Sequence, residues 1–175
     1  RAPDLPHQGA PLGASADQLR PFLDHLAIER ADVVGHSMGA LVATEFALRH
    51  PARTRSLAAL NAVFQRTPEQ RAAVESRAAL LKTAGLVETV APTLQRWFGD
   101  PVPADLRDAA ALTERLLRSV DPVGYARTYE LFAMSDRVHA DRLPALAARA
   151  LFMTADGELN SSPSMSHATW DVPRL

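Results

Sequence analysis

The chain has 175 residues, 47% of them hydrophobic, a formal net charge of -1 and no cysteine. This length and composition predict one globular domain with a hydrophobic core, and the near-neutral charge gives no reason to expect nucleic acid or an anionic membrane as a partner. The absence of cysteine excludes disulfides and thiolate metal sites and fits a cytoplasmic location, and no apolar run approaches the roughly 20 residues that span a bilayer.

The N-terminal part of the chain combines a loop with an amphipathic helix. Residues 1–14 are rich in proline and glycine, which predicts a loop. From Leu19 to Leu26, apolar residues recur at i, i+3, i+4 and i+7, which predicts a helix that packs on a sheet. We expect this helix to begin so that Pro21 falls in its first turn, where the missing N–H costs little.

The most informative motif is Gly35–Gly39, which reads G-H-S-M-G. It follows a short β-branched run at 32–34, typical of a buried parallel strand, and precedes a helical pattern over 38–50. Strand, sharp turn and helix are the context in which G-x-S-x-G indicates a nucleophile elbow. We expect both glycines to remove clashes across the turn, and Ser37 to hold a strained backbone with its hydroxyl exposed. A purely structural turn is the alternative interpretation.

Two further strands flank a long helical segment. We predict parallel strands over Ser56–Val63 and Ala150–Thr154. Between them the pattern is helical from residue 67 to about residue 142, which is too long for an ordinary crossover of about a dozen residues. Thr67 predicts the start of this segment, because proline follows it and glutamine stands three residues later. The pattern therefore predicts an α/β fold with a helical insertion.

Three segments together resemble the α/β-hydrolase superfamily. Val34–Ala40 resembles the elbow of its serine esterase and lactonase branch, which has a helical cap. Asp4–Gly9 is similar to the D-L-P-G-H-G loop of that branch, although His-Gln-Gly replaces Gly-His-Gly. Thr154–Pro163 resembles the T-G-x-x-D-x-N-S-T-P segment that carries the acid of the triad, with Glu158 at the acid position.

The resemblance implies a partial α/β-hydrolase fold that holds strands five to seven of the family. Residues 1–66 and 143–175 would form the hydrolase core, and residues 67–142 would form the helical cap over the carboxyl ends of the strands. Because the family has four strands before the elbow and an eighth after the acid, we expect this chain to be an internal piece of a larger enzyme.

The same resemblance assigns a catalytic machinery. Ser37 would be the nucleophile, and the backbone N–H of Met38, at the start of a helix, would be the first oxyanion donor. Glu158 is our first choice for the acid and Asp156 the second, while a solvated loop carboxylate is the alternative for each. The family places the base histidine after its eighth strand, so we expect it to be absent from this chain.

The histidines of the chain offer no obvious replacement for that base. His36 would point away from the nucleophile and hold the elbow through a hydrogen bond. His25, His50 and His139 are predicted to be surface or helix-end residues, and no pair has metal-ligand spacing together with a carboxylate, so we expect no metal site. That His139 or His167 folds in to serve as the base is the alternative.

The predicted cap is rich in groups suited to a substrate. Its large apolar residues would form either a pocket or simple cap core, and they are Trp97, Phe98, Tyr125, Tyr129, Phe132 and Met134. Arg96 would either receive a substrate carboxylate, as in enol-lactonase-like enzymes, or remain solvated. The runs 96–98 and 121–125 resemble the cap of 3-oxoadipate enol-lactonase-like hydrolases.

The prediction is therefore a serine hydrolase that acts on small-molecule esters or lactones through an acyl-enzyme, without a cofactor. Two alternatives remain open: a non-hydrolytic member of the fold that binds a ligand or catalyses a cofactor-free oxidation, and a catalytically silent fragment. The sequence does not indicate the oligomeric state, the substrate or the pathway.

Overall fold

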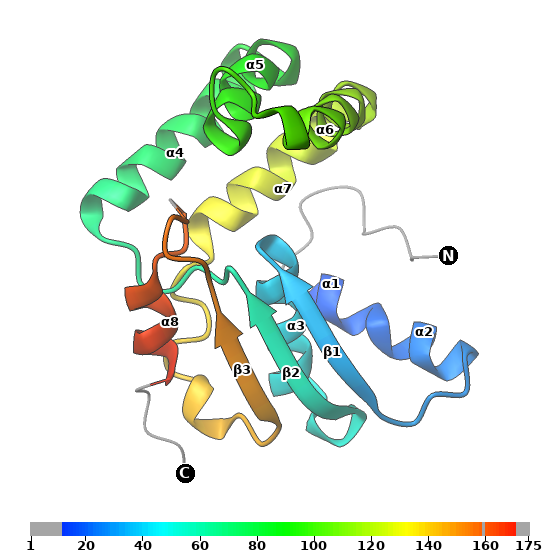
Figure 1. Cartoon of the computed structure of the whole chain (residues 1–175). Helices are drawn as coiled ribbons and strands as arrows, with labels where there is room; N and C mark the ends of the chain where they lie inside the picture. The colour runs from blue at the N-terminus through cyan, green and yellow to red at the C-terminus, as the bar shows by residue number, and fades with distance from the viewer. Residues whose placement is uncertain (1–11, 159, 171–175) are drawn as a thin grey trace.

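The centre of the structure is a parallel three-stranded sheet (Figure 1). This computed structural model describes residues 12–158 and 160–170. Strands β1 (Ala31–His36), β2 (Thr54–Leu60) and β3 (Arg149–Met153) lie in the order β1-β2-β3. The three predicted parallel strands are therefore confirmed, with the first of them at an edge of the sheet.

Helices and short 3-10 turns connect and cover the strands within the described residues. They are α1 (Leu12–Asp17), α2 (Leu19–His25), α3 (Met38–Arg49), η1 (Pro51–Arg53), α4 (Pro68–Thr83), α5 (Leu86–Phe98), η2 (Ala104–Leu106), α6 (Arg107–Ser119), α7 (Pro122–Met134), η3 (Leu143–Ala145) and α8 (Pro163–Trp170). The loop predicted over residues 1–14 is wrong from Leu12 onward. Leu12 and Ala16, one helical turn apart in α1, are buried in the core together with residues of α3.

Helix α3 covers one face of the sheet. Val33 of β1, Leu57 of β2 and Phe152 of β3 pack in the main core with this helix. On the opposite face, Val34, Ala58 and Leu151 form one cross-strand row. Val34 and Leu151, at the two ends of this row, are 66% and 53% exposed. The described residues therefore leave this apolar face of the sheet open to solvent.

Strand β2 begins and ends earlier than the predicted span of 56–63. Asn61 has a φ of 51°, in the left-handed region, and turns the chain out of the strand direction. Its backbone N–H nevertheless donates to the Met153 carbonyl at 2.8 Å. Ala62 and Val63 remain buried beyond the strand, which explains why an apolar pattern alone extends past its end.

Helices α4 to α7, residues 68–134, pack together beyond the carboxyl ends of the strands (Figure 1). We call them the helical segment. As predicted, Thr67 caps α4 with a capping box: its side chain accepts the Gln70 N–H, and the Gln70 side chain accepts the Thr67 N–H. Gly85 and Gly99 flank α5 with φ values of 82° and 85°, conformations that glycine adopts without strain.

A buried ion pair joins the two connections between the sheet and the helical segment, one before α4 and one after α7. The Asp136 side chain is fully buried, and that of Arg66 is only 2% exposed. The Arg66 backbone N–H donates to Asp136 Oδ2 at 2.8 Å, and Arg71 Nη2 lies 3.0 Å from the same oxygen. The Gln65 N–H donates to the Asp136 carbonyl at 2.8 Å. These bonds join the outgoing and returning connections.

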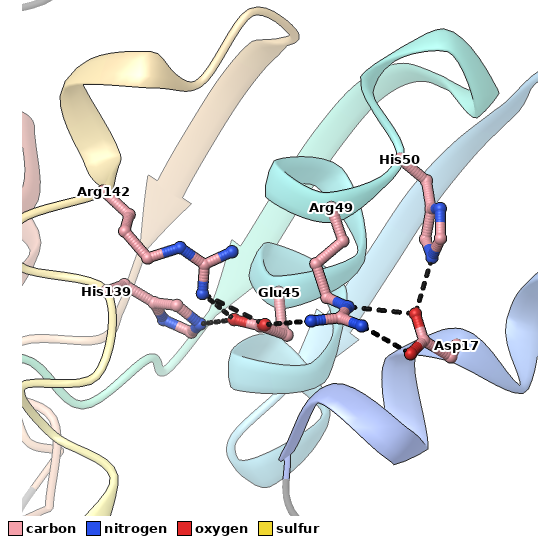
Figure 2. Close-up of polar contacts among 6 residues, drawn as sticks. All are labelled: Asp17, Glu45, Arg49, His50, His139 and Arg142. Atoms are coloured by element: carbon pink, nitrogen blue, oxygen red, sulfur yellow. Dashed lines mark hydrogen bonds and ion pairs between the residues drawn. The ribbon is translucent and has the colours of Figure 1, made fainter.

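A second polar network lies on the face of the sheet that α3 covers, and Figure 2 shows its six side chains: Asp17, Glu45, Arg49, His50, His139 and Arg142. Glu45 of α3 is buried and shares a hydrogen bond with His139 Nε2 at 3.1 Å. Arg142 Nη1 donates to Glu45 Oε2 at 2.8 Å. The prediction that His139 is a surface or helix-end residue is therefore wrong, whereas His50 does lie at the end of α3.

None of the described helices has both the length and the apolar character needed to cross a membrane.

Candidate active site

The turn between β1 and α3 holds Ser37 in an unusual conformation. Its φ of 55° and ψ of -119° are sparsely populated by residues with a side chain, and such backbones persist where the surrounding structure enforces them. A Cβ at Gly35 would lie 2.0 Å from the carbonyl oxygen of Gly39, so no side chain fits there. A Cβ on Gly39 would meet nothing within 4 Å. The expectation that both glycines relieve a clash is right for Gly35 and wrong for Gly39.

Hydrogen bonds to the neighbouring strand fix the position of the elbow. The Ser37 N–H donates to the Leu60 carbonyl at 2.9 Å, so the sheet ladder continues one residue past β1. Helix α3 begins at Met38. The N–H groups in the first turn of a helix have no intrahelical partner and lie at the positive end of its dipole. The Met38 N–H is therefore suited to stabilise negative charge that develops beside the serine.

A cavity of about 620 Å³ opens above the elbow. This volume falls within the range of about 300–1,000 Å³ that is typical of small-molecule sites. Ser37 and Met38 line it from the elbow, Asn61 from the end of β2, and Glu158 from the loop that follows β3. The rest of the wall comes mainly from α5 and α7 of the helical segment. The cavity therefore joins residues that are distant in sequence at the carboxyl ends of all three strands.

The structure distinguishes the two candidate acids by position. Glu158 lines the cavity, while Asp156 is exposed and does not. Glu158 Oε2 accepts a hydrogen bond from Asn61 Nδ2 at 3.0 Å, and Glu158 Oε1 accepts the backbone N–H of Asn160 at 2.8 Å. Both carboxylate oxygens are therefore held in place. Asn61 is not among the residues predicted from the sequence, and its only local signal is an asparagine directly after a strand.

Of His36, His139 and His167, only His36 lines the cavity. His36 is exposed and lines the cavity, and its ring makes no hydrogen bond within the described part of the chain. The predicted bond that holds the elbow is therefore not found among the described residues. His139 is bound to Glu45, away from the cavity, and His167 is exposed on α8. Neither lines the cavity, so the alternative that one of them folds in beside Ser37 is wrong.

Four of the six predicted apolar residues line the cavity: Trp97, Tyr125, Tyr129 and Phe132. The rings of Tyr125 and Tyr129 stack with centroids 6.3 Å apart. Burial raises the pKa of the Tyr125 hydroxyl, so this group stays protonated and can donate a hydrogen bond into the site. Phe98 is not part of the lining, and Met134 is 72% exposed elsewhere.

Arg96 supplies a cation to the same wall. Its guanidinium carbon lies 6.0 Å from the ring centre of Trp97, and it lines the cavity from the last turn of α5. Its Nε is buried and has no hydrogen-bond partner among the described residues. An unpaired, buried donor on a cation favours an anionic ligand. Within residues 12–158 and 160–170, no three His, Cys, Asp or Glu side chains group in a way that could hold a metal ion.

Comparison with known proteins identifies the family to which the fold belongs. The family described as alpha/beta hydrolase fold matches residues 6–171. The chain is 34% identical to the (E)-2-((N-methylformamido)methylene)succinate hydrolase of Acinetobacter baylyi, over 93% of this chain and 64% of that relative. It is 32% identical to 3-oxoadipate enol-lactonase 1 of the same organism, over 66% of this chain and 42% of that relative.

A solved structure shows the same fold. The enol-lactonase from Burkholderia xenovorans superposes with a TM-score of 0.78 at 24% identity, covering 94% of this chain and 62% of that one. The predicted D-L-P-G-H-G-like loop at Asp4–Gly9 lies outside the residues that the structure describes. The family match nevertheless extends over nearly the whole sequence, and this chain therefore belongs to the α/β-hydrolase fold family.

Proposed function

We propose that this chain carries the nucleophile, the first oxyanion donor and the acid of a serine hydrolase that cleaves esters or lactones of small carboxylates. The observation that carries the proposal is the shared cavity. Ser37, in its strained elbow, and Glu158, with both oxygens hydrogen-bonded, open into the same space of about 620 Å³. Strained backbone conformations such as that of Ser37 cluster at active sites.

In the proposed mechanism the Ser37 hydroxyl attacks the carbonyl carbon of the ester or lactone, and its proton passes to a base. The Met38 N–H stabilises the resulting oxyanion. When the tetrahedral intermediate collapses, the carbon–oxygen bond to the leaving alkoxide breaks, and that oxygen takes the proton from the base. Water then attacks the acyl-enzyme, releases the carboxylic acid and restores the serine.

The base in this mechanism is a histidine outside the described residues, which Glu158 would orient. His139 is bound to Glu45, and His167 does not line the cavity, so neither can take the proton. His36 does line the cavity, but it directly precedes Ser37 in the chain, and adjacent side chains leave the backbone in different directions. A glutamate suits the orienting role because its carboxylate accepts a hydrogen bond from the imidazole.

Residues 67–142 would act as the cap that selects the substrate. Helices α5 and α7 supply the aromatic wall, and Arg96 adds a cation whose Nε has no described partner. The relatives point to the same substrate chemistry, since their names denote a succinate derivative and a lactone of oxoadipate, both of which carry carboxylates. We therefore propose that Arg96 binds a carboxylate of the substrate while Ser37 attacks its ester or lactone carbonyl.

A matched pair of esters tests this proposal in the full-length protein. One carries a terminal carboxylate, and the other carries a neutral amide in the same place. Ser37→Ala should abolish hydrolysis of both esters. Arg96→Met should raise KM for the carboxylate ester by about tenfold or more, the effect of losing a charge-assisted hydrogen bond, and leave the neutral ester nearly unchanged.

Arg107→Met is the control, because Arg107 is exposed on α6 and does not line the cavity. It should affect neither ester. Equal effects of Arg96→Met on both esters would contradict the role of Arg96. Hydrolysis that persists in Ser37→Ala would contradict the proposed reaction itself.

A further inference from the structure

Arg77 of α4 links two parts of the molecule that the reaction would need to hold together. Its half-buried guanidinium donates through Nε to the Tyr129 hydroxyl at 2.9 Å. Through Nη2 it donates to Asn160 Oδ1 at 3.4 Å. Tyr129 belongs to α7 and lines the cavity, while Asn160 belongs to the loop that follows β3. Figure 1 shows α4 and α7 above this loop.

Asn160 also contacts the proposed acid, Glu158. Its Nδ2 donates to Glu158 Oε1 at 3.3 Å, and its backbone N–H donates to the same oxygen at 2.8 Å. The amide therefore has its oxygen toward a cation and its nitrogen toward a carboxylate. The opposite orientation would place the amide N–H groups against the guanidinium and the amide oxygen against the carboxylate, so both contacts would be repulsive.

We propose that Arg77 is a positioning residue for the acid: it fixes the Asn160 amide, and through it the Glu158 carboxylate, while it anchors the same loop to the cavity wall at Tyr129. This inference rests on the proposed function, in which Glu158 orients the base. A substrate that contacts Tyr129 would then affect the position of the Glu158 carboxylate through Arg77 and Asn160. Small errors in that position lower the rate strongly, because the proton acceptor must stand in the right place.

A double-mutant cycle in the full-length protein tests whether Arg77 acts through Glu158. Arg77→Met keeps an unbranched apolar stem close in size to that of arginine and removes the guanidinium donors, and it should lower kcat by about tenfold with little change in KM. In a Glu158→Gln background, where the carboxylate is already lost, the same substitution should lower kcat by less than about twofold. Losses that multiply in the double variant would overturn the proposal.

Lys82→Met is the matched control. Lys82 also lies on α4 and pairs with Glu130 of α7, so it joins the same two helices, but it is exposed and does not reach the loop after β3. Its removal should leave kcat nearly unchanged. If Lys82→Met and Arg77→Met lower kcat equally, Arg77 only holds the helices together and the proposal is wrong. If Arg77→Met does not fold, the same measurements are made on Arg77→Lys. A single ammonium group cannot donate to Tyr129 and Asn160 with the geometry of the guanidinium.

Hydrogen exchange of the loop gives a second readout that does not depend on activity. Arg77→Met should speed amide exchange over residues 155–161, including the Asn160 N–H, whereas Lys82→Met should not. Unchanged exchange in Arg77→Met would overturn the proposed link between Arg77 and the acid loop. Hydrolysis that survives Ser37→Ala would contradict the proposed function alone, and the exchange experiment would still decide whether Arg77 holds Asn160.

Discussion

Gly35→Ala is expected to destabilise the fold strongly, because the added methyl group has no space. Its carbon would lie 2.0 Å from the Gly39 carbonyl oxygen, 2.4 Å from the Gly39 carbonyl carbon and 2.8 Å from Ala40 Cα. All three atoms belong to the backbone, so no side-chain rotation relieves the clash. The strand and the helix would have to separate by about 1 Å, and overpacking of this kind lowers the free energy of unfolding by about 3 kcal/mol or more.

Gly39→Ala provides the matched control within the same motif. Its methyl group would meet nothing within 4 Å, and alanine favours the helix more than glycine does by about 1 kcal/mol. Urea unfolding of both variants, followed by circular dichroism, measures the difference. We expect Gly39→Ala to be at least as stable as the parent and Gly35→Ala to lose several kcal/mol or to fail to fold. Equal midpoints for the two variants would refute the account of the elbow.

Three further predictions concern charged groups. Glu158→Gln should lower kcat more than Asp156→Asn in an ester hydrolysis assay, and the reverse order would mean that the acid is wrongly assigned. Asp136→Ala should lower the free energy of unfolding by about 3–5 kcal/mol in urea titrations, because it leaves a buried arginine unpaired, whereas exposed Asp156→Asn should change it by less than about 0.5 kcal/mol. Burial acts to raise the pKa of Glu45, but hydrogen bonds from its histidine and arginine partners in Figure 2 outweigh it, so the pKa lies below its ordinary value of 4.5. Ionised Glu45 then stabilises the fold above pH 4.5, and this contribution is lost as the pH falls through the lowered pKa. As the pH is lowered through the acid range, the urea midpoint should therefore fall more steeply in the parent than in Glu45→Gln. An equal fall in both proteins would contradict this assignment.

The elbow could be predicted from sequence because its determinants are local. The β-branched run before Gly35 favours a strand, the apolar spacing after Ser37 favours a helix, and the turn between them requires a glycine. The capping box at Thr67 is equally local, and the structure shows it as expected. The α/β-hydrolase fold follows from these elements together with the resemblance of the acid loop, and the family match confirms it.

The supporting contacts of the site could not be predicted in this way, because they join distant parts of the chain. The bond from Asn61 to Glu158 spans 97 residues, and that from Arg77 to Asn160 spans 83. The same reason explains the wrong prediction for His139, whose partner Glu45 lies 94 residues earlier. Nothing in the local sequence around His139 indicates that its side chain contacts a buried carboxylate.

Covalent labelling tests most directly whether Ser37 is an activated nucleophile. A fluorophosphonate reacts with a serine whose hydroxyl a base has activated, and it does not react appreciably with ordinary surface serines. After labelling of the full-length protein and proteolysis, mass spectrometry should find the adduct on the peptide that contains Ser37, and Ser37→Ala should remove it. An adduct on another serine, or labelling that survives Ser37→Ala, would contradict the account.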